Sequence, residues 1–270
     1  MTKYLFAILI LGFISCGSSN STVEDNPSWY KPDINTSWQW QLKNDININY
    51  NVKLYDIDLF DTSTNTIDEL HNKNIKVICY FSAGSFEDWR SDKDKFPLSI
   101  LGNELDGWAG EKWLDVSNLD ILKPIMKSRL DLAKDKNCDG VEPDNVDGYT
   151  NNSGFSLSAN DQLIYNKFLA NEAHKRGLTI VLKNDLDQIQ ELEPYFDISL
   201  NEQCHEYNEC EKLSPFIKSN KPVFIAEYAS KYVNNTNNER DTMCASSINN
   251  KFKTLILPLY LDDSFRISCD

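Results

Sequence analysis

Short apolar runs of β-prone residues alternate with helical stretches along the chain from about residue 36 onward. The predicted strands are SWQWQL, VKLYDID, KVICYFSAG, KWLDVS, CDGVEPDN, LTIVLKND, FDISLNEQ, PVFIAEY and TLILPLYL. Continuous apolar strands that alternate with helices are typical of a parallel sheet covered on both faces. Eight or nine such strands in about 235 residues are close to the count and length of a (β/α)₈ barrel.

Helical periodicity appears in four stretches between these runs. They cover residues 67–72, 120–134, 159–176 and 186–193. The third has the clearest apolar stripe, and Gly177 follows it as a stop signal. The alternative fold is a doubly wound open sheet, but no glycine-rich phosphate-binding motif follows the first strand. We therefore predict a single α/β domain, a TIM-like (β/α)₈ barrel, over residues 36–270.

The N-terminal segment MTKYLFAILILGFISC resembles a bacterial lipoprotein signal peptide over residues 1–16. Its apolar run is too short to span a bilayer, and a small residue precedes Cys16. We expect Cys16 to be lipidated and the exported protein to be anchored to the outer membrane or cell surface. A plain secretory signal, with Cys16 an ordinary thiol, is the alternative. Residues 17–35 are expected to form a flexible tether.

The net charge of −14 argues against nucleic acid as a partner, because no stripe of Lys and Arg is available to neutralise phosphates. Such a charge is compatible with attraction of a cationic ligand. Many exported proteins are also acidic for solubility alone, and this alternative stays open. We expect the protein to be a monomer.

Export changes the interpretation of the six cysteines that follow the signal segment, because an even set in an oxidising compartment suggests disulfides. Cys204 and Cys210 are the favoured pair, since the five residues between them close a small loop. We also predict a bridge between Cys244 and Cys269. Cys79 lies inside the apolar run VICYF and is interpreted as a buried thiol. Zinc binding by CHEYNEC is disfavoured, because no second Cys/His pair stands at ligand spacing.

Polar residues gather at the C-terminal ends of the predicted strands. They are Asp56, Asp58, Ser82, Asp115, Glu142, Asp144, Asn145, Lys183, Asn184, Asp185, Asn201, Glu202 and Glu227. In a parallel barrel these ends converge on the face that carries the active site. Polar residues can also simply mark where strands become loops, but this explains a Glu or Lys directly after an apolar run less well. We expect these side chains to line a substrate site.

The segment DGVEPDNVDGY concentrates four carboxylates within residues 139–149. A calcium loop would need Gly at its sixth position and Glu at its twelfth. Taking Gly148 as sixth places Gly154 at the twelfth position, so the pattern fails. A strand-end carboxylate, Asp144, facing the barrel mouth is the favoured interpretation, with Asp147 and Tyr149 beside it.

Carboxylates are the best-supplied catalytic groups in this sequence. Neither a G-x-S-x-G nor an H-E-x-x-H motif occurs, and only three histidines are present. Two carboxylates that flank a bond are sufficient for glycoside hydrolysis. Aromatic rings that can stack on sugars also lie near strand ends or loops. Those placed in the predicted substrate site are Trp40, Tyr80, Tyr149 and Tyr228.

The motifs WQWQL, YDIDLFD, VICYFSAGSFEDWR, KWLDVS, CDGVEPDNVDGY, LKND and NEQCHEYNEC resemble glycoside hydrolase family 114, the endo-α-1,4-polygalactosaminidases. The resemblance implies a (β/α)₈ barrel and an exported enzyme that cuts galactosamine-containing polysaccharide within the chain, without a cofactor or metal ion. It also implies that Asp144 and Glu202 are the catalytic pair. We expect Asp144 to be the nucleophile and Glu202 the acid/base of a retaining cleavage.

Two alternatives stay open at this point. The first is a non-catalytic glycan-binding lipoprotein on the same barrel, although a degenerate enzyme would be expected to lose a catalytic carboxylate and both are kept. The second is a metal-dependent hydrolase that uses the carboxylate ring, which a chelator would inactivate.

Overall fold

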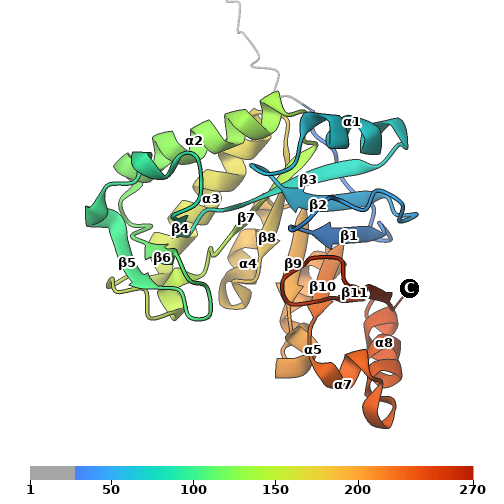
Figure 1. The fold of residues 1–270 in the computed structure, drawn as a ribbon. Helices are drawn as coiled ribbons and strands as arrows, with labels where there is room; N and C mark the ends of the chain where they lie inside the picture. The colour runs from blue at the N-terminus through green and yellow to red at the C-terminus, as the bar shows by residue number, and fades with distance from the viewer. Residues whose placement is uncertain (1–27, 270) are drawn as a thin grey trace, which may run out of the picture.

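Eight parallel strands form one curled sheet in the computed structural model, which describes residues 28–269 (Figure 1). Their order is β1-β2-β3-β7-β8-β9-β10-β11, and β12 adds an antiparallel edge to β11. The bounds are β1 Trp38–Gln41, β2 Leu54–Asp58, β3 Lys76–Ser82, β7 Gly140–Asp144, β8 Thr179–Lys183, β9 Ile198–Glu202, β10 Val223–Glu227, β11 Lys253–Ile256 and β12 Ile267–Ser268. The predicted TIM-like barrel in a single domain is confirmed.

Helices follow most of the strands and cover the outside of the sheet (Figure 1). They are α1 Thr64–Asn72, α2 Leu119–Asp135, α3 Ala159–Lys175, α4 Ile189–Leu192, α5 Cys204–Tyr207, α6 Ser214–Lys218, α7 Ser230–Val233 and α8 Glu239–Asn249. The start of α3 is fixed by a capping box, in which Ser158 and Asp161 each accept a backbone N–H from the other. The predicted helix over 159–176 therefore begins where the sequence places it.

The inside of the barrel changes from apolar to charged along each strand. Because side chains alternate between the two faces of a strand, Leu54, Asp56 and Asp58 of β2 share one face. The lower part of the interior is filled by apolar side chains such as Trp38 and Phe224, whose rings stack at 4.6 Å. Charged groups therefore collect at the C-terminal ends of the strands, above an apolar floor.

The seam between the first and last parallel strands is closed by side chains. Within residues 28–269 no backbone ladder joins β1 to β11. The Trp38 indole N–H donates to the Lys253 carbonyl at 2.9 Å. Arg266, beside β12, donates to the Trp38 carbonyl at 2.9 Å and to the Gln39 side chain at 2.7 Å. These contacts hold the two edges of the sheet together.

The segment KWLDVS does not form a barrel strand, and this prediction is wrong. It contributes β6 (Glu111–Leu114) to a separate antiparallel sheet with β4 (Ser85–Glu87) and β5 (Leu101–Glu104), in the order β4-β6-β5. This sheet is inserted between β3 and β7 and stands at one side of the barrel, on the left of Figure 1. The reason is local, because the neighbours of β6 along the chain are strands with which it can pair directly.

The N-terminal end of the described chain packs against the bottom of the barrel. The Trp29 ring stacks on His174 at 3.9 Å, and its indole N–H donates to Asp197 at 3.0 Å. The Thr179 hydroxyl donates to the Tyr30 carbonyl. Residues 29–34, placed within the predicted tether, are thus held at the N-terminal ends of β8 and β9. The signal peptide and Cys16 lie outside the described residues.

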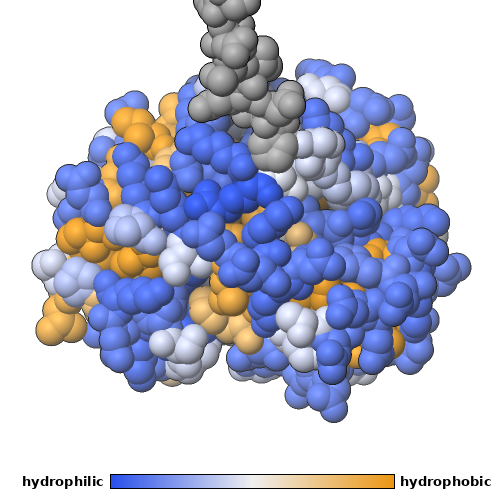
Figure 2. Space-filling model, turned by 90° about the horizontal axis from the view of Figure 1, so that it is seen from above, coloured by the Kyte–Doolittle hydropathy of each residue, from blue (hydrophilic) through white to orange (hydrophobic). Residues whose placement is uncertain are grey.

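The surface seen in Figure 2 is mostly hydrophilic, with hydrophobic residues in separate patches. This fits a chain with a net charge of −14. Across residues 28–269, none of the helices has the length and apolar character needed to cross a membrane.

Three disulfides link the six cysteines that follow the signal segment. The predicted bridges Cys204–Cys210 and Cys244–Cys269 are confirmed. Cys79 is not a buried thiol, because it is bonded to Cys138. The two lie 59 positions apart in sequence, but β3 pairs directly with β7, and this pairing brings Cys79 beside the residues that precede β7.

Candidate active site

Lys183, the last residue of β8, lies at the centre of the charged barrel mouth. Its side chain is only 2% exposed. The Nζ atom is 3.0 Å from Asp144 Oδ1, 3.1 Å from Glu202 Oε2 and 3.6 Å from Glu142 Oε1. It also lies 4.8 Å from the centre of the Trp40 ring. One buried cation therefore organises three carboxyl groups from two neighbouring strands.

Asp144 and Glu202 end β7 and β9, the strands on either side of β8. Their side chains are 17% and 28% exposed, whereas that of Glu142 is fully buried. Two oxygens that both lie within 3.1 Å of one nitrogen are at most about 6 Å apart, close enough for two carboxylates to act on one bond. Asp144 and Glu202 are the two carboxylates of this cluster that a ligand can reach.

The loop that carries Asp144 is fixed by backbone contacts. The Asn145 N–H donates to Asp144 Oδ1 at 2.7 Å, and the Asp144 carbonyl accepts from Ala83 and Gly84 at 2.9 and 3.0 Å. Asn145 has φ 61° and donates through its side chain to Ser82 Oγ at 3.0 Å. A Cβ on Gly84 would stand 1.6 Å from the Asn145 carbonyl oxygen. Glycine is therefore required where β3 leaves the barrel beside Asp144.

Glu202 is held from three directions. The Tyr228 hydroxyl donates to Glu202 Oε1, and the Glu202 N–H donates to Asn184 Oδ1 at 3.0 Å. Behind it, the buried Glu227 carboxylate accepts the His205 N–H at 2.8 Å at the start of α5. The Cys204–Cys210 disulfide closes the same loop. The residues that follow Glu202 are thus anchored to β10.

Two further carboxyl groups, Asp56 and Glu142, are buried under this cluster. Burial raises the pKa of each well above its ordinary value, and the charge on Lys183 opposes that shift only in part. Neither oxygen of Glu142 has a hydrogen-bond partner within residues 28–269. Both groups are favoured in the protonated form, so the positive charge of Lys183 acts mainly on Asp144 and Glu202.

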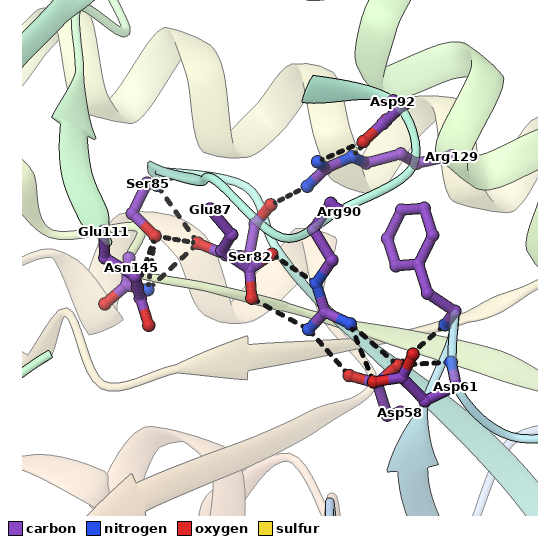
Figure 3. Close-up of polar contacts among 11 residues, drawn as sticks. Asp58, Asp61, Ser82, Ser85, Glu87, Arg90, Asp92, Glu111, Arg129 and Asn145 are labelled. Carbon is purple, nitrogen blue, oxygen red and sulfur yellow. Dashed lines mark hydrogen bonds and ion pairs between the residues drawn. The ribbon is translucent and has the colours of Figure 1, made fainter. Parts of the chain in front are cut away.

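One wall of the site is built around Arg90, which is buried between two carboxylates (Figure 3). Its guanidinium donates to both oxygens of Asp58, at 2.7 and 3.0 Å, and to both oxygens of Glu87, at 2.8 Å. Asp61, at the surface, lies 3.5 Å away. Bidentate pairs of this kind fix geometry as well as charge. The β4 segment is thereby fastened to the end of β2.

A second arginine, Arg129 of α2, supports the same wall from behind (Figure 3). It makes a bidentate pair with Asp92 at 2.9 Å and donates to the Ser82 carbonyl. Next to it, the Ser85 hydroxyl donates to Glu111 Oε2 at 2.8 Å. Burial raises the pKa of Glu111 to about 7. The inserted sheet therefore contributes a carboxyl group that titrates near neutral pH.

These residues enclose a central cleft of about 570 Å³ over the ends of the strands. Asp144, Lys183 and Glu202 lie at its floor, and Trp89, Trp108 and Tyr260 lie at its exposed rim. Trp108 and Tyr260 meet edge to face, with ring centres 6.2 Å apart. The cleft combines a carboxylate floor with aromatic edges, which are the two features that a sugar-cleaving site needs.

Comparison with known families decides the class of protein. Residues 18–270 match glycoside hydrolase family GH114. The chain belongs to this family. It is a glycoside hydrolase. No curated protein matches the chain.

Solved structures place this GH114 member among barrel enzymes. Ega3 of Aspergillus fumigatus, in complex with galactosamine, is 42% identical, with a TM-score of 0.82 over 90% of this chain and 98% of that one. The glycoside hydrolase domain of PelA from Pseudomonas aeruginosa is 12% identical, with a TM-score of 0.67 over 86% and 98%. D-allulose 3-epimerase from Methylomonas sp. is 11% identical, with a TM-score of 0.50 over 85% of each chain, and shows the fold alone.

Most of the residues predicted for the site of this GH114 hydrolase gather at the barrel mouth. The central cleft is lined by Trp40, Asp58, Tyr80, Asp144, Asn145, Asp147, Lys183, Asn184, Glu202 and Tyr228. Tyr149 and Asn201 line an adjoining smaller cleft. Asp56, Ser82, Glu142 and Glu227 are buried beneath or behind these surfaces.

Asp115 is the exception among the predicted residues. It follows β6 in the inserted sheet, and its carboxylate accepts from the hydroxyl and N–H of Ser117. It lines neither cleft, because the strand before it is not part of the barrel. The sequence reasoning also missed Glu87, Arg90 and Glu111. The sequence feature that could have indicated Glu87 and Arg90 is their Glu-x-x-Arg spacing directly after the predicted strand KVICYFSAG.

Within residues 28–269, one group of potential metal ligands lies close together: Cys204, His205 and Cys210. Both sulfurs are committed to the disulfide, so the group offers a single imidazole. Burial lowers the pKa of His205 to about 4, which keeps this ring neutral.

Proposed function

We propose that the chain is an endo-acting glycoside hydrolase that cleaves α-1,4-linked galactosamine or N-acetylgalactosamine polysaccharide. The observation that carries the proposal is the pair Asp144 and Glu202, which reach one cleft from either side of Lys183. The substrate class is supported by the galactosamine complex of Ega3, at 42% identity over most of the chain. The membership in GH114 supports the reaction class.

The proposed reaction has two steps. Asp144 attacks the anomeric carbon while Glu202 gives its proton to the glycosidic oxygen, so the bond to the leaving sugar breaks and a glycosyl ester forms. Glu202, now ionised, then takes a proton from water, and the water oxygen replaces Asp144 at the anomeric carbon. The configuration is inverted twice and therefore retained.

The spacing of the two carboxylates fits a retaining reaction. Retaining pairs stand about 5–5.5 Å apart, and inverting pairs stand roughly 6.5–9.5 Å apart to leave room for a water molecule. The shared contact with Lys183 limits the nearest oxygens of Asp144 and Glu202 to about 6 Å. Asp144 Oδ1 also accepts two hydrogen bonds, from Lys183 Nζ at 3.0 Å and from the Asn145 backbone N–H at 2.7 Å, and these fix the orientation of the carboxylate that a nucleophile needs.

The charge of the protein supports a cationic substrate. Deacetylated galactosamine units carry ammonium groups, and the chain has a net charge of −14 with carboxylates gathered around the cleft. The exposed rims at Trp89, Trp108 and Tyr260 offer aromatic surfaces for the apolar faces of sugar rings.

The test is hydrolysis of α-1,4-galactosamine polymer, with and without N-acetyl groups, by the purified protein. Asp144→Asn and Glu202→Gln are each expected to lose several orders of magnitude in kcat while the fold survives. Asp115→Asn is the matched control, because this carboxylate lies outside both clefts. Nuclear magnetic resonance of the first product should show the α-anomer. Near-normal turnover by either catalytic variant, or a β-anomer as first product, would contradict the proposal.

A further inference from the structure

A chain of hydrogen bonds joins the inserted sheet to the loop that carries Asp144, and Figure 3 shows its part from Glu111 to Asn145. Glu111, the first residue of β6, accepts the Ser85 hydroxyl at 2.8 Å. The Ser82 and Ser85 hydroxyl oxygens lie 2.6 Å apart. The Asn145 side-chain amide donates to Ser82 Oγ at 3.0 Å and to Ser85 Oγ at 3.2 Å. We call this the serine chain and define it by Glu111, Ser85, Ser82 and Asn145.

The directions of the bonds in the serine chain follow from the number of hydrogens. Ser85 gives its only hydroxyl hydrogen to Glu111, so the Ser82 hydroxyl must donate to Ser85. Ser82 Oγ then accepts the Ser85 backbone N–H at 3.1 Å and one hydrogen of the Asn145 amide. Ser85 Oγ accepts the Ser82 hydroxyl and the other amide hydrogen. Each buried hydroxyl therefore donates one hydrogen bond and accepts two, which is its full capacity.

The ionised form of Glu111 stabilises this order, because a carboxylate accepts a hydrogen bond more strongly than a neutral acid does. A proton on Glu111 Oε2 would turn it into a donor to Ser85, whose own hydrogen would then point to Ser82. Ser82 Oγ would face three donors with two lone pairs, so the bond from Asn145 would be lost. A proton on Oε1 instead would remove the charge that strengthens the bond from Ser85. Either protonation leaves Asn145 less firmly held.

Asn145 determines how the Asp144 carboxylate is oriented. Its φ of 61° lies in the left-handed region that most residues avoid, and its side-chain bonds to the two serines hold it there. This conformation directs its backbone N–H to Asp144 Oδ1, at 2.7 Å. The serine chain thus connects a carboxyl group of the inserted sheet to the position of the proposed nucleophile.

Glu111 changes its charge in the neutral pH range. The titratable and charged groups around it are Tyr80, Glu87, Arg90 and Asp144. Burial raises the pKa of Glu111 to about 7, against the opposing effect of the Ser85 hydrogen bond. The charges of Glu87 and Asp144 raise this pKa further, and that of Arg90 lowers it. Tyr80 stays neutral, because burial raises its pKa well above the ordinary value.

We propose that Glu111 is a positioning residue for Asp144, on which it acts through the serine chain, and that turnover is fastest when Glu111 is ionised. The inference rests on the proposed function and deepens it, because it gives the inserted sheet a role in the reaction. Glu111 also lines the central cleft. Its positioning role is separate from any contact with the sugar and predicts an effect on kcat rather than on KM.

The experiment compares the kinetics of the full-length wild type and Glu111→Gln on α-1,4-galactosamine polymer between about pH 5.5 and pH 8.5. Glutamine keeps the shape of the side chain and offers Ser85 a neutral oxygen, as the protonated acid does. The wild type should exceed the variant in kcat about tenfold at the upper pH and at most about twofold at the lower pH. KM should be unchanged. The ratio of the two proteins cancels the titration of the substrate and of groups that both contain.

Two further variants distinguish the serine chain from a general effect of charge. Ser85→Ala keeps the Glu111 carboxyl but interrupts the chain, so it should lower kcat, and adding Glu111→Gln to it should have little further effect at any pH. Glu104→Gln is the matched control, because Glu104 is an exposed carboxylate of the same inserted sheet and lines neither cleft. Its kcat should equal that of the wild type at every pH.

The outcomes separate this inference from the proposed function. If the wild type does not cut the polymer, the proposed function fails and the inference falls with it. If the wild type cuts the polymer but its kcat exceeds that of Glu111→Gln by the same factor at every pH, the inference alone fails. A change confined to KM would show that Glu111 binds the sugar, which also overturns the inference. Additive effects of Ser85→Ala and Glu111→Gln would do the same.

Discussion

Replacing Lys183 by Met removes the cation that contacts the carboxyl groups of Asp144, Glu202 and Glu142. Lys183 is 2% exposed and contacts Asp144, Glu202 and Glu142 within 3.6 Å. Breaking a buried ion pair by removing one partner costs about 3–5 kcal/mol, because the remaining charge is left uncompensated. We expect Lys183→Met to lower the free energy of unfolding by this amount and to abolish turnover.

The measurement is a urea titration at neutral pH in which unfolding is monitored by tryptophan fluorescence. Lys212→Met is the matched control, because its partner Asp187 is at the surface and an exposed pair contributes only about 0–1 kcal/mol. Adding Asp144→Asn to Lys183→Met should restore part of the lost stability, since one uncompensated charge is then removed. A Lys183→Met protein within about 1 kcal/mol of the wild type would refute this account of the cluster.

Burial raises the pKa of Asp185 to about 8 from an ordinary 3.8, so its contribution to stability is complete below pH 4 and is lost as the pH rises to 8. Urea titrations should therefore show that the free energy of unfolding of Asp185→Asn rises relative to that of the wild type between pH 4 and pH 8. Gly84→Ala should lower the free energy of unfolding by about 1–3 kcal/mol in the same assay, because the alanine Cβ would overlap the Asn145 carbonyl oxygen. An unchanged free energy of unfolding would show that the loop can move aside. Added salt should reduce kcat/KM on deacetylated polymer; if it does not, the acidity serves solubility alone. Mass spectrometry of the mature protein should find lipid on Cys16, and an unmodified thiol there would reject the lipoprotein prediction.

The barrel mouth could be predicted from the sequence because parallel strands align their ends. Asp144, Lys183 and Glu202 each follow an apolar run, and neighbouring strands of one sheet must bring such residues together. Alternation along each strand also places Asp56 and Glu142 inside the barrel. What the sequence does not contain is the convergence of three carboxyls on one nitrogen, which depends on the tilt and packing of three strands.

The rest of the site comes from contacts that no local pattern records. Arg90 belongs to the segment after β3 and pairs with Asp58, at the end of β2, across a sequence separation of 32. Cys79 reads as an ordinary apolar position until the pairing of β3 with β7 brings it to Cys138. KWLDVS has the composition of a barrel strand, but it pairs antiparallel with β4 and β5 in the inserted sheet. Asp115, which follows this strand, therefore lies outside the barrel mouth.

The packing of Trp29 against the bottom of the barrel determines from which end of the barrel the N-terminal segment leaves. Its ring and indole N–H are held by His174 and Asp197 at the N-terminal ends of the strands, opposite the end where Asp144 and Glu202 lie. If Cys16 carries a lipid as predicted, the stretch from Cys16 to Trp29 spans at most about 45 Å. The membrane would then lie on the side of the barrel away from the active site. Polymer arriving from outside would meet the open clefts first, and cut fragments would be released outward.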